Sequence, residues 1–294
     1  MYLIIGANGY LGSYILKTVL EKTTDSIVAT ARNVDVAVEN DRVKWVACDV
    51  TDGFQVNSLF DSISNKKELK VIYLAAYHNP DLVEKNPRTA WNINITALSY
   101  FVNKSANIKC FFYPSTDSVY GESKNYYHFK ESDSLNPVNI YGKQKVLAEQ
   151  IIHTYGYNVV RYPFLISPSL SPVKKHFYDF ILDDLKQGKK VEMFMDSFRS
   201  TISFSQAAQM LIQLMENYSE SMPKTINICG DSDMSKYDVG LYIARKTGFS
   251  DERIVPISIQ SGNDIFKAKR ASSTLMDNSL IKEILKVKKI NLEI

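Results

Sequence analysis

The chain has 294 residues, of which 45% are apolar and 23% are charged, and its formal net charge is +3. This length suits one large domain or two modest ones, and the composition is that of a soluble globular protein. Lysine and arginine are scattered along the chain, so neither nucleic acid nor a membrane surface is expected as a partner.

The sequence also predicts where the protein resides. No apolar run reaches the roughly 18 residues needed to span a bilayer, and the first residues lack a signal-peptide pattern. The three cysteines are far apart, and Cys48 and Cys110 stand where small buried residues of a reducing compartment are expected. No cysteine or histidine cluster suggests a metal. We therefore expect a cytoplasmic protein without a metal site.

The N-terminus predicts a buried strand over residues 2–5, a glycine-rich turn, and an amphipathic helix over residues 10–21. Gly6, Gly9 and Gly12 have the GxxGxxG spacing of a dinucleotide-binding turn. The first glycine permits the bend, the second lets backbone approach a pyrophosphate, and the third lets the helix pack closely on the strand. We expect further cofactor contacts in this turn from Asn8, Tyr10 and Leu11.

The second and third strands are expected over residues 26–30 and 43–48. Folds that prefer NAD place a carboxylate just after the second strand, whereas an arginine there accommodates the 2′-phosphate of NADP. Positions 29–33 contain no Asp or Glu, so Arg32 predicts NADP(H), with NAD(H) possible and a plain surface arginine as the alternative. After the third strand, Asp49 and Val50 are expected at the adenine end, and Thr51 or Asp52 is a candidate helix cap.

The fourth strand, expected over residues 71–76, ends in Ala75 and Ala76, whose small side chains let backbone approach a ligand at Tyr77. A long helix is expected over residues 82–105 and a fifth strand over residues 109–113. That strand delivers a polar run to the edge where open α/β sheets bind ligands. The run includes Thr116, Asp117 and Ser118.

A tyrosine and a lysine follow on the next expected helix. Tyr141 and Lys145 are four residues apart and therefore share one helix face. A phenol beside an ammonium is a workable proton donor, because the positive charge favours phenolate and lowers the tyrosine pKa from about 10. The alternative is an ordinary polar pair on a solvated face.

Strands and helices alternate from residue 2 to a sixth strand at residues 157–161, which predicts an α/β fold with a Rossmann-like doubly wound parallel sheet. We expect a dinucleotide-binding domain over residues 1–162. Residues 163–294 are expected to form a smaller mixed α/β substrate-binding lobe, with possible exchange of chain between the two. Its expected helices cover residues 173–187, 205–218, 236–247 and 278–285, and its strands residues 225–228 and 253–257.

Taken together, these motifs resemble the extended short-chain dehydrogenases/reductases, the NAD-dependent epimerase/dehydratase superfamily. The resemblance covers the whole chain. Within the superfamily, several stretches look most like dTDP-4-dehydrorhamnose reductase. These stretches are residues 75–77, 115–117, 136–143 and 270–277. In the last stretch, Ala271 replaces the proline that is usual in that family.

The resemblance implies a role for each site residue. Tyr141 is the general acid, Lys145 lowers its pKa and binds the nicotinamide ribose, and Thr116 hydrogen-bonds the substrate oxygen. Three further residues are implied as substrate contacts, with the arginine facing a diphosphate. They are Asp117, Ser118 and Arg199.

The resemblance leaves more than one chemistry open. Dehydratases of the superfamily place a glutamate where this chain has Ser118, and epimerases usually show the acidic residue that is missing near Arg32. We therefore expect NADPH-dependent reduction of a 4-keto nucleotide sugar. An epimerase remains an alternative, as does a non-catalytic NADP-binding regulatory subunit like that of methionine adenosyltransferase. The resemblance also implies a possible homodimer, because members of the family are commonly dimeric.

Overall fold

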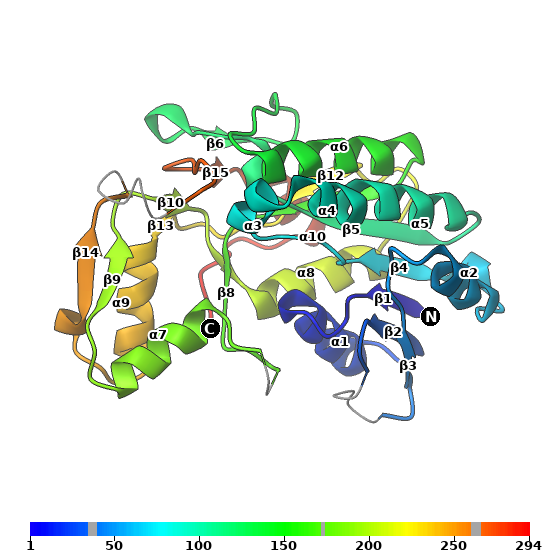
Figure 1. The fold of residues 1–294 in the computed structure, drawn as a ribbon, viewed down its shortest axis with the longest axis horizontal. Helices are drawn as coiled ribbons and strands as arrows, with labels where there is room; N and C mark the ends of the chain where they lie inside the picture. Colours follow the sequence, from blue (N-terminus) through cyan, green and yellow to red (C-terminus); the bar gives the residue numbers. More distant parts are fainter. Residues whose placement is uncertain (35–39, 172–173, 260–265) are drawn as a thin grey trace.

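The computed structural model describes residues 1–34, 40–171, 174–259 and 266–294 (Figure 1). Within these residues, seven strands form one parallel sheet in the order β12-β7-β5-β4-β1-β2-β3. The strands are β1 (Tyr2–Ile5), β2 (Ile27–Ala31), β3 (Val43–Ala47), β4 (Lys70–Tyr73), β5 (Cys110–Thr116), β7 (Asn158–Tyr162) and β12 (Thr225–Asn227). Each predicted strand of the first half is present, and its ends lie within three residues of the predicted ones.

The strand order explains where a ligand can enter. The chain builds outward from β1 to β2 and β3, then returns to the other side of β1 with β4 and β5. Reversal of the order between β1 and β4 opens a crevice at the carboxyl ends of these strands. The glycine-rich turn follows β1 directly, so the fold places it in that crevice.

Helices cover both faces of the sheet, which confirms the doubly wound fold (Figure 1). On one face, α1 (Tyr10–Lys22), α8 (Phe204–Glu216) and α10 (Ser279–Leu285) pack their apolar side chains against alternate residues of the strands. On the other face, α2 (Gly53–Asp61), α5 (Leu98–Lys104) and α6 (Ile140–Thr154) do the same. Strand residues therefore alternate between two cores, as Leu3 and Ile4 do.

The long helix expected over residues 82–105 is wrong, because the chain breaks it. The segment forms α3 (Pro80–Lys85), α4 (Pro87–Trp91), a π-helical turn η2 (Asn92–Ala97) and α5. Pro87 has no N–H to donate and disfavours helical backbone at the residue before it, and Asn86 accordingly leaves the helix with φ −130° and ψ 60°. The side chain of Asn94, inside η2, points to the sheet edge and bonds both backbone groups of Tyr77.

The second half forms a smaller packed unit of its own, with α7 (Phe177–Lys186) and α9 (Lys236–Lys246) against the parallel pair β9 (Val191–Phe194) and β14 (Ile254–Ile257). Three further two-stranded pairs join distant segments. They are β10 (Phe198–Arg199) with β13 (Met234–Ser235), β11 (Ile202–Ser203) with β8 (Leu165–Ile166), and β15 (Leu275–Met276) with β6 (His128–Phe129).

The remaining short elements are 3₁₀ turns. They are η1 (Lys66–Glu68), η3 (Asp117–Val119), η4 (Lys124–Tyr126) and η5 (Asp251–Arg253). Among the described residues, no helix is both long and apolar enough to cross a membrane.

Segments from the second half of the chain lie in and against the large sheet. β12 lies well beyond residue 162, yet it pairs in parallel with β7 at the edge of the large sheet. Helix α8, also from the second half, packs against α1 beneath that sheet. A boundary at residue 162 therefore does not separate the sheet from the rest of the chain, and how the chain divides into domains stays a prediction.

Candidate active site

The glycine-rich turn forms a tight connection between β1 and α1. Gly6 has a φ of +82°, and the N–H of Gly9 donates to its carbonyl oxygen at 3.0 Å. A Cβ on Gly12 would overlap that same oxygen and approach the backbone of Ala7 to 2.9 Å. No side chain caps α1 at Gly9, so no side chain occupies the first N–H groups of the helix, which begins directly after the turn. These features leave a bare backbone cradle with exposed donors, which suits a phosphate.

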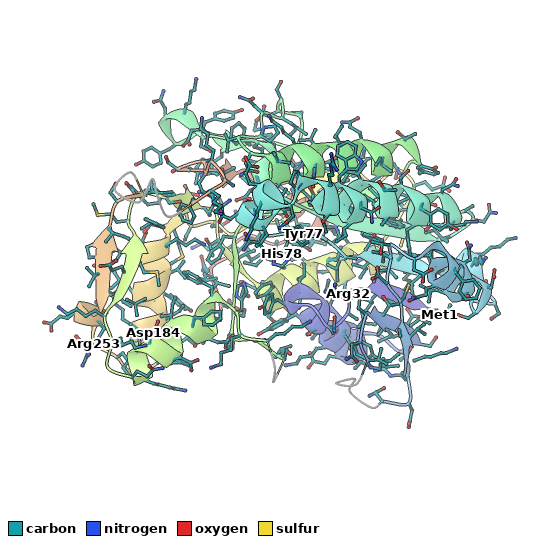
Figure 2. All side chains as sticks on the ribbon, in the orientation of Figure 1. Met1, Arg32, Tyr77, His78, Asp184 and Arg253 are labelled. Atoms are coloured by element: carbon teal, nitrogen blue, oxygen red, sulfur yellow. The ribbon has the colours of Figure 1, made fainter. Side chains whose placement is uncertain are left out.

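A cavity of about 810 Å³ runs from this cradle along the carboxyl edge of the sheet. Every residue predicted to contact the cofactor lines it, so the fold brings the whole predicted set together. The set is Gly6, Asn8, Gly9, Tyr10, Leu11, Gly12, Arg32, Asp49, Val50, Ala75, Ala76, Tyr77, Tyr141 and Lys145. In Figure 2, Tyr77 and His78 lie between the two layers of helices, and Arg32 lies nearer to β2 and β3.

The predicted adenine end lies after β3. Asp49 accepts hydrogen bonds from the N–H and hydroxyl of Thr51 at 2.9 and 2.7 Å, which fixes the turn that leaves the strand. Asp52 caps α2 by accepting from Phe54 and Gln55, as expected for one of the two candidate caps. The two expected roles therefore belong to different residues. Asp49 lines the cavity, where the adenine end is expected, and Asp52 caps the helix.

The three predicted catalytic residues line the other part of the cavity. Thr116 is the last residue of β5, whereas Tyr141 and Lys145 lie one turn apart on α6. Asn139 caps this helix by accepting from the N–H of Gly142 at 2.9 Å. A Cβ on Gly142 would lie 2.6 Å from the carbonyl oxygen of Ser118, so glycine at this position lets α6 approach η3.

Lys145 is 3% exposed, and its ammonium is held by neighbours other than Tyr141. Its Nζ donates to the hydroxyl of Tyr113 at 2.7 Å and to the carbonyl oxygen of Pro114 at 2.9 Å. Burial lowers the pKa of Lys145 from 10.5 to about 7, although the nearby carboxylate of Glu149 opposes that change. At neutral pH this lysine is therefore divided between its charged and neutral forms.

The prediction that Lys145 lowers the pKa of Tyr141 is wrong in this structure. Burial and, after it, the negative charge of Asp117 raise the pKa of Tyr141 above its ordinary value of 10. Lys145 does not offset these two effects, and its ammonium is bound by Tyr113 and Pro114. Tyr141 therefore keeps its proton throughout the neutral range.

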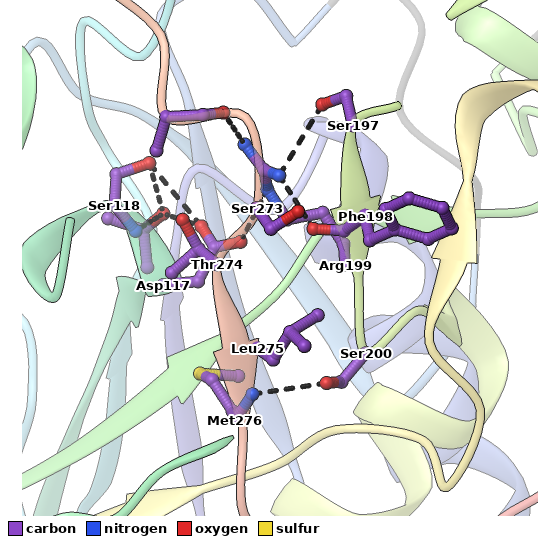
Figure 3. Close-up of polar contacts among 12 residues, drawn as sticks. Asp117, Ser118, Ser197, Phe198, Arg199, Ser200, Ser273, Thr274, Leu275 and Met276 are labelled. Carbon is purple, nitrogen blue, oxygen red and sulfur yellow. Dashed lines mark hydrogen bonds and ion pairs between the residues drawn. The ribbon is translucent and has the colours of Figure 1, made fainter. Parts of the chain in front are cut away.

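The predicted substrate residues fall into two groups. Thr116 lines the cavity, but Asp117, Ser118 and Arg199 do not. Figure 3 shows the guanidinium of Arg199 among the backbone of its own chain. It donates to the carbonyl oxygens of residues 198, 271 and 272 at 2.7 to 3.0 Å, and its Nε lies 3.2 Å from Asp117. Most of its N–H groups are thus used inside the protein, which argues against the expected diphosphate contact.

A second arginine near the site is structural. The guanidinium of Arg161 on β7 bonds both carboxylate oxygens of Glu149, with its closest contact at 2.7 Å, and both side chains are almost completely buried. Glu149 also accepts from the hydroxyl of Ser115. This network ties α6 to β5 and β7, so it fixes the helix that carries Tyr141.

Sequence reasoning missed several residues of the cavity wall, and the most informative come from the second half. Lys174 and His176 precede α7, and Phe204 begins α8. The ring of His176 lies 4.6 Å from that of Tyr10, and burial lowers its pKa from 6.5 to about 4, so the ring is neutral. The sequence places these residues more than 160 positions from the glycine-rich turn, and no local pattern signals the contact.

Among the described residues, no group of three or more His, Cys, Asp or Glu side chains is placed to hold a metal ion. The cysteines Cys48, Cys110 and Cys229 are buried and free. That the protein uses no metal stays a prediction.

Comparison with known proteins gives the family. The family described as RmlD substrate binding domain matches residues 1–292. A curated relative, methionine adenosyltransferase 2 subunit beta of Bos taurus, is 24% identical over 288 residues, which cover 96% of this chain and 81% of the relative.

Solved structures share the fold. A dTDP-4-dehydrorhamnose reductase from Clostridium acetobutylicum has a TM-score of 0.79 at 24% identity, covering 99% of this chain and 94% of the other. A second, from Bacillus anthracis in complex with NADP, has a TM-score of 0.80 at 19% identity, with the same coverage. The predicted resemblance is confirmed, and because the family match spans nearly the whole chain, this protein belongs to the RmlD substrate-binding-domain family.

Proposed function

We propose that the chain is an NADPH-dependent reductase of a 4-keto nucleotide sugar. The observation that carries the proposal is that Thr116, Tyr141 and Lys145 line one end of a cavity whose other end is the glycine-rich cradle. Family membership and the similar fold of dTDP-4-dehydrorhamnose reductases support the same conclusion. Because these reductases are less than 25% identical to this chain, the activity itself rests on the site.

The residues present fit a nicotinamide dinucleotide. The cradle offers a pyrophosphate the N–H groups of a helix start that no side chain caps, and a side chain at Gly12 would clash with the backbone of the turn that shapes the cradle. Arg32 after β2 favours the 2′-phosphate of NADP(H), and NAD(H) remains possible. One solved structure of similar fold is a complex with NADP and another, a UDP-glucuronic acid 4-epimerase from Bacillus cereus, a complex with NAD.

A bound reduced nicotinamide supplies the hydride. Tyr141 gives its proton to the substrate carbonyl oxygen, so that hydride and proton together convert a ketone to an alcohol. The raised pKa of Tyr141 keeps that proton available at neutral pH. The hydroxyl of Thr116 donates to Asp117 at 3.0 Å, and by rotating about its side-chain bond it stabilises the developing negative charge on the same substrate oxygen.

A second function is favoured by the curated relatives. They include methionine adenosyltransferase 2 subunit beta, whose name describes a subunit. On this alternative the chain binds NADP and acts through a protein partner, without reducing a sugar. A nucleotide-sugar epimerase of the same superfamily is a further alternative, and a homodimer stays a prediction.

The test is to incubate the protein with NADPH and a panel of 4-keto nucleotide sugars and to follow the absorbance of reduced nicotinamide. We expect oxidation with at least one sugar and a fall in kcat of at least about 100-fold in Tyr141→Phe. Tyr100→Phe is the matched control, because its hydroxyl bonds Asn57 on α2 and does not line the cavity.

Two results would count against the proposal. If the folded protein binds NADPH but oxidises it with no sugar of the panel, the regulatory-subunit alternative is favoured. Full turnover by Tyr141→Phe would remove this tyrosine from the role of proton donor.

A further inference from the structure

Two cations from distant parts of the chain line the same end of the cavity. Arg32 follows β2, and Lys174 belongs to the connection between β8 and α7. Partial burial and, after it, the positive charge of Arg32 lower the pKa of Lys174, so the two positive charges act on each other. Within the described parts of the chain, no carboxylate pairs with either of them.

The position of Lys174 is fixed by contacts with the glycine-rich turn. Its Nζ donates to the carbonyl oxygen of Asn8 at 3.0 Å. The next residue is held too, because the hydroxyl of Tyr10 donates to the carbonyl oxygen of Lys175 at 2.6 Å. The start of the connection is attached to α1, where the hydroxyl of Tyr14 donates to Pro168 at 2.8 Å. The ammonium is therefore held over the turn, and two of its three N–H groups have no acceptor among the described residues.

Two like charges held close together repel each other, and an anion between them removes that repulsion. The place just after the second strand of a dinucleotide fold is where NADP carries its 2′-phosphate. A phosphate monoester has a charge of about −1.5 to −2 at neutral pH, which two cations neutralise. An unphosphorylated ribose offers no such charge.

We propose that Lys174 and Arg32 together bind the 2′-phosphate of NADP(H), so that the second half of the chain takes part in choosing the cofactor. This inference rests on the proposed function, since it assumes a nicotinamide dinucleotide in the cavity. It goes further by assigning specificity to a residue that no dinucleotide-binding motif contains. It also means that the 2′-phosphate of NADP(H) joins Lys174, before α7, to Arg32, after β2. NAD(H) has no 2′-phosphate and cannot form this link.

The experiment measures binding of NADPH, NADH and 2′,5′-ADP by calorimetry, with four forms of the protein. They are the wild type, Lys174→Ala, Lys174→Gln and Lys175→Ala. The glutamine variant keeps a donor for Asn8 but removes the charge. Lys175 is the matched control, because it is also exposed but its Nζ is paired with Asp183 at 2.5 Å.

We expect both Lys174 variants to bind NADPH and 2′,5′-ADP about 10- to 100-fold more weakly, the usual range for loss of a charge-assisted hydrogen bond. Binding of NADH should stay within about twofold, and Lys175→Ala should bind all three ligands like the wild type. Higher salt should weaken NADPH binding more in the wild type than in Lys174→Gln.

Other outcomes overturn the inference. Equal weakening of NADPH and NADH would mean that Lys174 only holds the turn, and unchanged binding of NADPH would mean that it does not touch the phosphate. If the wild type binds neither NADPH nor NADH, the proposed function itself fails. A wild type that binds NADPH, together with Lys174 variants whose affinities for NADPH and NADH either fall equally or do not fall at all, leaves the proposed function standing and refutes this inference alone.

Discussion

Replacing Lys145 with methionine should change how the free energy of unfolding depends on pH. The ordinary lysine pKa of 10.5 falls to about 7 in the folded chain because the amine is buried. Between these two values the unfolded chain holds a proton that the folded chain has released, so the stability of the wild type rises with pH across this window. Methionine carries no titrating proton, so the variant lacks this contribution.

The magnitude follows from the two pKa values. Each pH unit is worth about 1.4 kcal/mol, so at pH 7, where Lys145 is about half neutral, its lowered pKa costs the folded state about 4 kcal/mol. By about pH 9.5 roughly 1.4 kcal/mol of that cost remains. The wild type should therefore gain about 3 kcal/mol relative to Lys145→Met over this range. The variant also leaves the buried acceptors at Tyr113 and Pro114 unpaired, at about 1–3 kcal/mol each, but that loss is nearly constant with pH.

The measurement is urea unfolding of both proteins at several pH values, with Lys143→Met as the control. Lys143 is exposed on the same helix, so its replacement should leave the slope with pH unchanged. Parallel stability curves for the wild type and Lys145→Met would refute the reasoning, because they would mean that the buried amine keeps its ordinary pKa. The comparison of slopes does not depend on the constant loss of hydrogen bonds.

Three further predictions concern the walls of the site. Gly12→Ala should abolish NADPH binding by calorimetry, because its Cβ overlaps the backbone of the turn. Glu149→Gln should lower the free energy of unfolding by about 3 kcal/mol or more, since it removes the carboxylate that balances the buried charge of Arg161. Tyr113→Phe removes an acceptor from Lys145 and should therefore lower the pKa of that lysine, which the pH profile of kcat/KM would show. Tyr73→Phe is the control and should leave that pKa unchanged, because the buried hydroxyl of Tyr73 has no hydrogen-bond partner in the part of the chain that the structure describes.

Much of the dinucleotide-binding half was predictable because its signals are local. A short apolar run that stops at a glycine is a buried strand whether or not the rest of the chain is known, and residues 2–12 give both the strand and the turn. The parallel sheet then forces the carboxyl ends of β1, β4 and β5 to one edge. Residues as far apart in sequence as Gly6 and Tyr141 therefore meet at the cavity by topology alone.

The parts that the sequence did not predict depend on contacts between distant segments. The spacing of Tyr141 and Lys145 on α6 was correct, but the partner of the lysine is Tyr113 on β5. Arg199 stands in the expected stretch, yet the backbone before β15 occupies its donors. The break at Pro87 is different, because the proline itself signals it: Pro87 has no N–H to donate and disfavours helical backbone at Asn86.

The pKa of Tyr141 bears on the direction of the chemistry. An epimerase of this superfamily must first oxidise a hydroxyl, so its tyrosine has to begin as a base, whereas a reductase needs a phenol that still holds its proton. Burial and Asp117 raise the pKa of Tyr141, which favours the protonated phenol. The charge of Lys145 would oppose this, but the lysine is turned toward Tyr113 and is half neutral near pH 7. The electrostatics of the site therefore favour the protonated phenol, which is the form that the proposed reduction requires.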